Sequence, residues 1–226
     1  MTTAAGVKNL VQLLLARHPK LVLARRLIVL PPIRHVISAI LIDRTSMPVG
    51  FTPCWATNCL FDPQHEFYLS YGSRIFPPPG VDWEIDRPNI QLELAETVEQ
   101  SGLPEIRAIK TIEHFRDFAT HGLEGPGRRL NENQLQNLYV QIAMGQFDEA
   151  EKACNYLKQR RSIYSHACFD ADIRRIKELV GPLLLARDRG GLAALLHEWE
   201  EITVNKLGLK KHWQPSPFPL ETVKPE

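Results

Sequence analysis

A helix–turn–helix corner between residues 143 and 154 is the feature that most constrains what this chain can fold into. The segment reads Ala-Met-Gly-Gln-Phe-Asp-Glu-Ala-Glu-Lys-Ala-Cys. Gly145 is typical of a residue that ends a helix, and Phe147 begins a second helical run after a turn through Gln146. Ala150 and Ala153 are small enough to let the second helix lie close against the first. The segment therefore predicts a pair of packed antiparallel helices.

Helical periodicity extends over much of the rest of the chain. Near the start, Val7, Leu10, Val11 and Leu14 recur on one face of a predicted helix over 3–18. Glycines separate the later helical segments, as expected at helix ends. After Pro88 the predicted helices span 89–101, 104–120, 132–145, 147–161, 170–188 and 190–207.

Between these helical regions, β-branched and aromatic residues are concentrated in short runs bounded by turn-forming residues. In the last run, Phe67, Leu69 and Tyr71 alternate with polar or small neighbours, so one face of that strand is apolar. We expect three or four antiparallel strands, at 27–30, 34–42, 49–60 and 66–75.

Together these segments predict an α+β protein, with an N-terminal helix on a small antiparallel sheet followed by an all-helical region of αα-hairpins. The predicted organisation is an α+β region at 1–121, a linker at 122–130, helical hairpins at 131–207 and a proline-rich tail at 208–226. Trp213 and Phe218 predict that the tail docks on the folded body, because a disordered tail normally lacks large aromatic residues. The alternative is a short linear motif that offers the same residues to another protein.

Charge is balanced overall but uneven at the start of the chain. The net charge is +1, and the first acidic residue is Asp43. A basic start without acidic residues is typical of a mitochondrial transit peptide or of a membrane-surface helix, but the continuous apolar pattern favours a folded helix followed by a strand. The longest uncharged stretch, 45–61, contains Pro48 and Pro53, so we predict no transmembrane span and a cytoplasmic location.

Cysteine usage and motif content argue against a metal, a cofactor or a local catalytic motif. Four cysteines are too few for a disulfide scaffold in 226 residues, and we expect reduced, buried thiols. The Cys54–Cys59 spacing lacks the further ligands of a zinc site. The sequence has no GxGxxG, P-loop or GxSxG motif, and the one local pairing of a nucleophile with a base is Cys168 with His166. We predict no catalytic residues, no metal and no cofactor.

The corner at Gly145 resembles one unit of the tetratricopeptide family. The likeness covers residues 135–158 and rests on the turn and the second helix, while the residues that mark the first helix of the family are missing. A solenoid needs about three repeats, so the resemblance implies a helical hairpin rather than a repeat array. It also implies binding of a peptide or of a partner protein.

Two groups of residues are candidate binding surfaces. Tyr68, Ser70 and Arg74 fall on one side of the predicted strand 66–75, and Trp83 anchors the loop that follows. Aromatic and arginine side chains are typical of protein interfaces, although an ordinary amphipathic strand shows the same pattern. The second group is a basic patch that two antiparallel helices could assemble against phosphates, or that could be an ordinary solvated face. It consists of Lys158, Arg160, Arg161, Arg174, Arg175 and Lys177.

The leading functional prediction is a non-catalytic, cytoplasmic protein-interaction module that binds another protein, in the manner of a bacterial immunity or accessory protein. One alternative is a small enzyme whose site is assembled around the sheet from His35, Arg44, His65 and Arg74. The other is a nucleic-acid-associated protein that uses the basic patch, which the near-zero net charge disfavours. A deep polar cleft would favour the enzyme, and a broad apolar surface would favour the interaction module.

Overall fold

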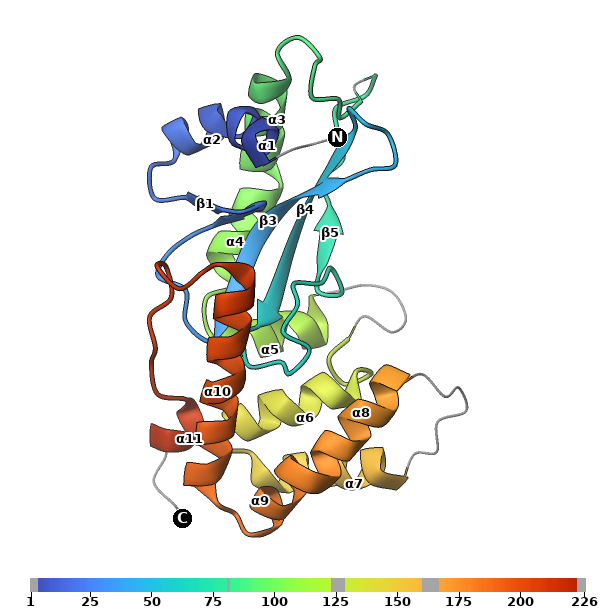
Figure 1. Cartoon of the computed structure of the whole chain (residues 1–226), viewed down its shortest axis with the longest axis vertical. Helices are drawn as coiled ribbons and strands as arrows, with labels where there is room; N and C mark the ends of the chain where they lie inside the picture. The colour runs from blue at the N-terminus through green and yellow to red at the C-terminus, as the bar shows by residue number, and fades with distance from the viewer. Residues whose placement is uncertain (1–3, 81, 123–128, 160–166, 223–226) are drawn as a thin grey trace.

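The computed structural model describes residues 4–80, 82–122, 129–159 and 167–222. It contains one five-stranded antiparallel sheet, with helices gathered around both ends of the two long strands (Figure 1). The predicted α+β class is confirmed. The sheet has five strands where three or four were predicted. The additional strand lies before residue 27 and pairs with the strand that follows it.

The strands lie in the sheet in the order in which they occur in the sequence, as a meander. The pair β3–β4 is the longest, and it runs from Val36 opposite Cys59 to Arg44 opposite Phe51. β-Branched residues dominate β3, as expected for a strand that is covered on both faces. The strands are β1 (Val22–Ala24), β2 (Leu27–Val29), β3 (Val36–Arg44), β4 (Phe51–Cys59) and β5 (Gly72–Arg74).

Each face of the sheet packs against a different part of the chain. Ile28, Ile40 and Ile42 belong to a cluster with the helices before and after the strands, which are α1 (Ala4–Leu10), α2 (Gln12–Arg17), α3 (Ile90–Gln100) and α4 (Gly102–Ala108). Alternate residues such as Ile37 point the other way, into a cluster that contains Val204 near the end of α10 (Arg189–Leu207). The sheet is therefore a central layer between two sets of helices.

The predicted strand 66–75 is reduced to its last residues, and two side-chain effects explain the difference. The side-chain amide of Asn58 donates to the Tyr68 carbonyl oxygen (2.9 Å) and accepts from the Tyr68 N–H (3.0 Å), so it replaces backbone pairing at this point. Strand β5 starts at Gly72, where an added Cβ would lie 2.0 Å from the backbone oxygen of Trp55. Only glycine permits this close approach of the two strands.

Three of the predicted helices consist of more than one element, and the first of them, 3–18, is interrupted at Val11 between α1 and α2. The segment 104–120 separates into α4 and α5 (Ile112–His121), because the Thr111 side chain accepts a hydrogen bond from the His114 N–H and caps a new helix. The segment 170–188 is continuous but changes geometry through a π-helical turn. Its parts are α8 (Ala167–Arg175), the π-helical turn η1 (Ile176–Val180) and α9 (Gly181–Leu185).

The corner that opened the sequence analysis joins α6 (Gln134–Ala143) to α7 (Phe147–Gln159). Gly145 has a φ of +73°, a left-handed conformation that glycine adopts without strain. The N–H of Gln146 donates to the Gln141 carbonyl oxygen at 2.9 Å and closes the end of the helix. Ala150 is fully buried, as its small size predicts.

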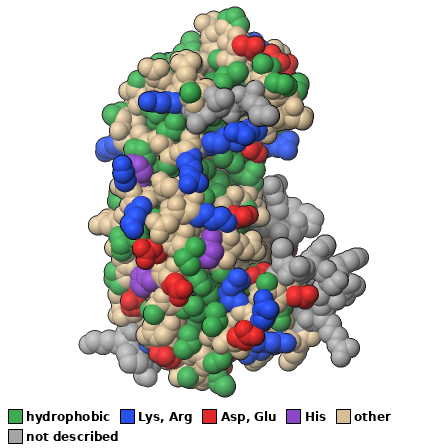
Figure 2. All heavy atoms as spheres, viewed as in Figure 1, with side chains coloured by type: hydrophobic (Ala, Val, Ile, Leu, Met, Phe, Trp, Pro, Cys, Tyr) green, Lys and Arg blue, Asp and Glu red, His purple; other side chains and the backbone are tan. Residues whose placement is uncertain are grey.

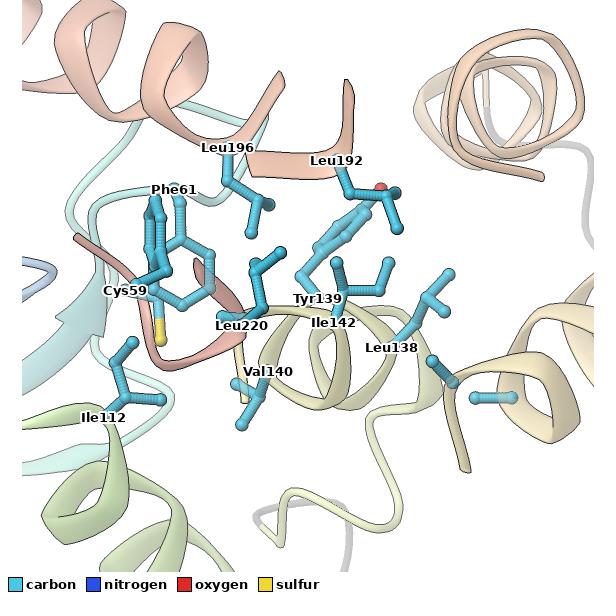
Figure 3. Close-up of a cluster of buried hydrophobic side chains, with 14 of the residues drawn as sticks. Cys59, Phe61, Ile112, Leu138, Tyr139, Val140, Ile142, Leu192, Leu196 and Leu220 are labelled. Carbon is cyan, nitrogen blue, oxygen red and sulfur yellow. The ribbon is translucent and has the colours of Figure 1, made fainter. Parts of the chain in front are cut away.

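The tail after α10 docks on the body, as predicted. Phe218 and Leu220 are fully buried, and Trp213 forms a backbone bridge with Ile33. Leu220 lies between α6 and α10 in the main hydrophobic cluster (Figure 3). The tail is not wholly extended, because it ends in a short helix, α11 (Pro219–Thr222).

The main cluster also crosses the predicted domain boundary. It joins Phe61 and Phe115, which precede residue 122, to Leu138 and Leu196, which follow residue 130. Most of the predicted linker, residues 123–128, lies outside the described residues.

Candidate functional site

The four residues predicted to bind a partner do not form one surface. Ser70 and Arg74 are exposed, but the Tyr68 hydroxyl points inward and donates to the Asp62 carboxylate at 2.7 Å. Trp83 is buried against the ring of Phe51, and its indole N–H donates to the Ile75 carbonyl oxygen. The aromatic members of the predicted surface therefore stabilise the fold.

The described members of the basic patch lie on three elements, α7, α8 and η1. Arg174 and Lys177 are exposed on α8 and η1, and Arg175 pairs with Asp172 at 2.6 Å. Lys158 lies on α7, with its ammonium group near Gly181. Arg160 and Arg161 lie outside the described residues, as do residues 160–166 in general and the side chain of Cys168.

The four polar residues proposed for an enzyme site around the sheet are also not brought together. His35 directly precedes β3 and Arg44 ends it, and nine steps of extended strand span about 30 Å. His65 lies in the connection after β4, where its ring nitrogen meets the Thr203 hydroxyl at 2.9 Å. One of the four, His35, nevertheless belongs to a cluster of titratable groups.

This cluster, which we name the tail clamp, consists of His35, His197 and Glu200 together with the tail residues Ser216, Pro217, Phe218 and Glu221. Nδ1 of His35 lies 3.2 Å from Oε1 of Glu200, a side chain with no exposed surface. Nε2 of the same ring lies 3.0 Å from the Ser216 hydroxyl and 3.2 Å from the Pro217 carbonyl oxygen. His35 thereby connects the start of β3 to both α10 and the tail.

His197 makes the second half of the tail clamp. Its Nε2 lies 2.9 Å from Oε2 of Glu221, and its Nδ1 lies 3.6 Å from Oε2 of Glu200. The same Glu221 oxygen accepts the backbone N–H of Phe218 at 2.6 Å. The Phe218 ring stacks on His35 with centroids 4.0 Å apart and contacts His197 at 4.6 Å. Two imidazoles thus hold both the backbone and the aromatic anchor of the tail.

The charges of these groups support one another. Burial alone would raise the pKa of Glu200, but hydrogen bonds from His197 and His35 outweigh it, so its pKa lies below the ordinary value. The hydrogen bond to Glu200 and that to Glu221 raise the pKa of His197 against the opposing effect of burial. Glu200 is therefore ionised, and His197 favours its cationic form.

The order Ser216–His35–Glu200 is that of a catalytic triad, but the contacts argue against this chemistry. Nε2 of His35 faces both the Ser216 hydroxyl at 3.0 Å and the Pro217 carbonyl oxygen at 3.2 Å, so this nitrogen is not aimed at Ser216 alone. Proline at position 217 also lacks the N–H that commonly binds an oxyanion after the nucleophile. The geometry fits a charged clamp on the tail.

Burial outweighs the nearby groups that would activate the buried thiols, such as Lys158 beside Cys154. Cys54, Cys59 and Cys154 are free and buried, and desolvation raises the pKa of each. A raised pKa reduces the thiolate fraction, which is the reactive form. Within the described ranges, no three His, Cys, Asp or Glu side chains are grouped so that they could hold a metal ion.

An apolar strip lies on the surface between η1–α9 and α10. We define it by Leu179, Leu183, Leu195 and Ile202. Leu179 is 47% exposed, Ile202 is 42% exposed, and the other two are half-buried. An added Cβ at Gly191 would lie 2.8 Å from the Leu183 side chain, so α9 and α10 meet there.

Figure 2 shows hydrophobic side chains gathered over this region, with Lys and Arg side chains beside them over α8. Leu195 is about one helical turn from Gly191, and Ile202 about two turns further, on the same face of α10. Leu179 is similarly one turn before Leu183. Leu183 and Leu195 therefore lie near the α9–α10 contact, and Leu179 and Ile202 extend the strip along η1 and α10.

Comparison of the chain with protein-family models, with curated protein sequences and with solved structures finds no match. In the part of the chain that the structure describes, no helix combines the length and the apolar character needed to cross a bilayer. Function is therefore argued from the surfaces of this chain alone.

Sequence reasoning did not find the tail clamp, although one local signal points toward it. Glu200 shares a helix face with Leu196 and Val204, one turn to either side, and both are buried. A carboxylate on an apolar face needs a buried partner. Its hydrogen-bond partner His35 is 165 positions away in the sequence, so no motif spacing could identify it.

Proposed function

We propose that this protein is a non-catalytic protein-interaction module that binds a helix of a partner protein along the apolar strip. The observation that carries the proposal is the exposure of large aliphatic side chains on η1 and α10, on either side of the α9–α10 contact. Contiguous exposed apolar surface of this kind marks interaction sites in soluble proteins. The α6–α7 hairpin, which resembles a tetratricopeptide unit, supports the region from beneath through α7.

The shape of the strip favours a helix as its occupant. Two helical walls border it, and an amphipathic helix binds such a groove through residues spaced by three or four positions. Leu179 and Ile202 supply the exposed apolar contacts, one from each wall.

The charges at the edges of the strip specify the partner further. The α8–η1 edge presents Arg174 and Lys177, which make no ion pair with any described residue. The α10 edge presents Glu198 and Glu201, and Glu201 reaches Lys210 at 3.7 Å. A complementary helix carries acidic side chains on the flank that meets α8 and basic side chains on the flank that meets α10.

The experiment compares proteins retained from native lysate by the wild type, by the double variant Leu179→Asp/Ile202→Asp and by the control Leu92→Asp. Leu92 is 38% exposed on α3, at the other end of the molecule. We expect a stoichiometric partner that the wild type and the control retain and the double variant loses. Hydrogen exchange on the purified complex should then show protection over residues 176–202.

Two outcomes contradict this function. If the double variant retains the same proteins as the wild type, the strip is not the binding surface. If the wild type alone is a dimer that the double variant dissociates, measured by light scattering after gel filtration, the occupant is a second copy of the chain. The nucleic-acid alternative predicts instead binding that weakens steeply with salt and that depends on Arg174 and Lys177 rather than on the leucines.

A further inference from the structure

Two adjacent hollows form a groove on a different part of the molecule, where the β2–β3 connection faces the α4–α5 connection. Their volumes are about 350 Å³ and 400 Å³, and both are lined by Arg34, Lys110 and Thr111. The shared residues place the two hollows side by side. We name this feature the seam groove.

One end of the seam groove is apolar. Its lining includes Leu30, Ile33, Ile106 and Ile109. Ser38 also lines it, but its hydroxyl donates to the Ile109 carbonyl oxygen at 2.7 Å and is already satisfied. This end can therefore contact a hydrocarbon or aromatic group of a ligand. The Ser38 hydroxyl does not require a polar group from that ligand.

The other part of the seam groove, from the residues that both hollows share into the second hollow, is basic. Arg34 and Lys110 are exposed and make no ion pair with any described residue, and the one polar contact of Arg34 is a long hydrogen bond to Gln214 at 3.4 Å. The first turn of α5 lies beside them, and its initial N–H groups have no acceptor within the helix. Glu113 is the acidic residue of this lining.

The two ends together specify a ligand. We propose that the seam groove binds a small amphiphilic anion, with an apolar acyl or aryl body between Leu30 and Ile109 and a carboxylate or phosphate head at Arg34 and Lys110. Two cations against one carboxylate favour an anionic head, and the volume of each hollow is within the range of small-molecule sites. This site is separate from the apolar strip and does not depend on the proposed function.

Isothermal titration calorimetry with octanoate, octyl phosphate, octanol and acetate tests the proposal on the full chain. We expect octanoate or octyl phosphate to bind with one-to-one stoichiometry, and the tighter of the two identifies the head group. Octanol lacks the charge and acetate lacks the apolar body, so each should bind at least about tenfold more weakly.

Variants then locate the site. Arg34→Gln and Lys110→Gln should each weaken binding of the anion about tenfold, because each removes a charged hydrogen bond. Leu30→Asn should weaken it at the apolar end. Lys152→Gln, an exposed control on α7, should leave the affinity unchanged. Circular dichroism and Tm confirm that each variant is folded.

Three results overturn the proposal. The first is no saturable binding of either anion. The second is equal affinity for octanol and octanoate, which removes the role of the basic end. The third is binding that the arginine and lysine variants leave unchanged, which places the ligand elsewhere on the protein.

Discussion

Replacing Glu200 with Gln tests the charge balance of the tail clamp. The side chain is fully buried, with its carboxylate 3.2 Å from His35 and 3.6 Å from His197. Gln keeps the size and one hydrogen-bond acceptor but removes the negative charge. In Glu200→Gln, the protonated His197 ring is left without the buried carboxylate that raises its pKa.

The expected loss depends on pH. Removing one member of a buried ion pair costs about 3–5 kcal/mol, and each kcal/mol lowers Tm by about 2–4 °C in a chain of this size. At about pH 5.5, where histidines are protonated, Tm should fall by about 6–20 °C. At about pH 8.5 neutral imidazoles need no counter-ion, so the difference should shrink to about 2–4 °C, the effect of losing about 1 kcal/mol.

The stability of the wild type should itself depend on pH, in a range that His197 and Glu200 determine. The raised pKa of His197 adds stability that is present below the ordinary histidine pKa and is lost as pH rises through the folded value. The lowered pKa of Glu200 adds stability that is present above the ordinary glutamate pKa and is lost as pH falls through the folded value. Both contributions are complete between about pH 4.5 and 6.5.

Thermal melts followed by circular dichroism at both pH values measure these effects. Glu201→Gln is the matched control, because it lies next in sequence, is exposed and forms only a surface ion pair with Lys210. An equal loss of Tm in Glu200→Gln at the two pH values would show that packing, not charge, sets the cost. No loss at about pH 5.5 would refute the clamp as a stabilising element.

Three further predictions concern the hairpin, the thiols and the tail serine. Ala150→Leu should overpack the α6–α7 contact and cost about 1–3 kcal/mol, measured by urea denaturation; an unchanged midpoint contradicts the packing. The fully buried thiol of Cys59, whose pKa is raised well above its ordinary value, should react with Ellman's reagent only after unfolding. Rapid labelling of the native protein at Cys59 would disagree with that burial. Ser216 should not be labelled by a fluorophosphonate, and a labelled Ser216 peptide in the mass spectrum would restore the triad interpretation.

The sequence predicted correctly those elements that residues close together in the chain specify. Gly145 and Ala150 sufficed for the α6–α7 corner, because a left-handed cap and a small contact residue specify it. The strand at 66–75 failed where the Asn58 side chain replaces backbone pairing, and the helix at 104–120 divided at the Thr111 cap. Both differences arise from single side-chain hydrogen bonds that periodicity does not record.

The candidate surfaces could be predicted less well, for a related reason. The tail clamp joins residues 165 and 181 positions apart, and the seam groove joins Arg34 to Lys110 across the fold. Contacts between residues so far apart in the chain produce no motif or periodicity that can be recognised in the sequence. The sequence predicted that two helices carry the basic patch, and its described residues lie on α7 and on the continuous α8–η1 segment.

Because His35 is far in sequence from its partners, the sheet is synthesised well before the helix and the tail that cover it. The ring of His35 leaves the ribosome 181 residues before Ser216, which at about 5–20 residues per second is a delay of about 10–35 s. During this interval the sheet face around Ile37 and the ring of Phe61 lack α10 and Phe218, their later covering. A nascent chain in this state exposes a hydrophobic sheet face, so it is a natural client for chaperones until the tail arrives.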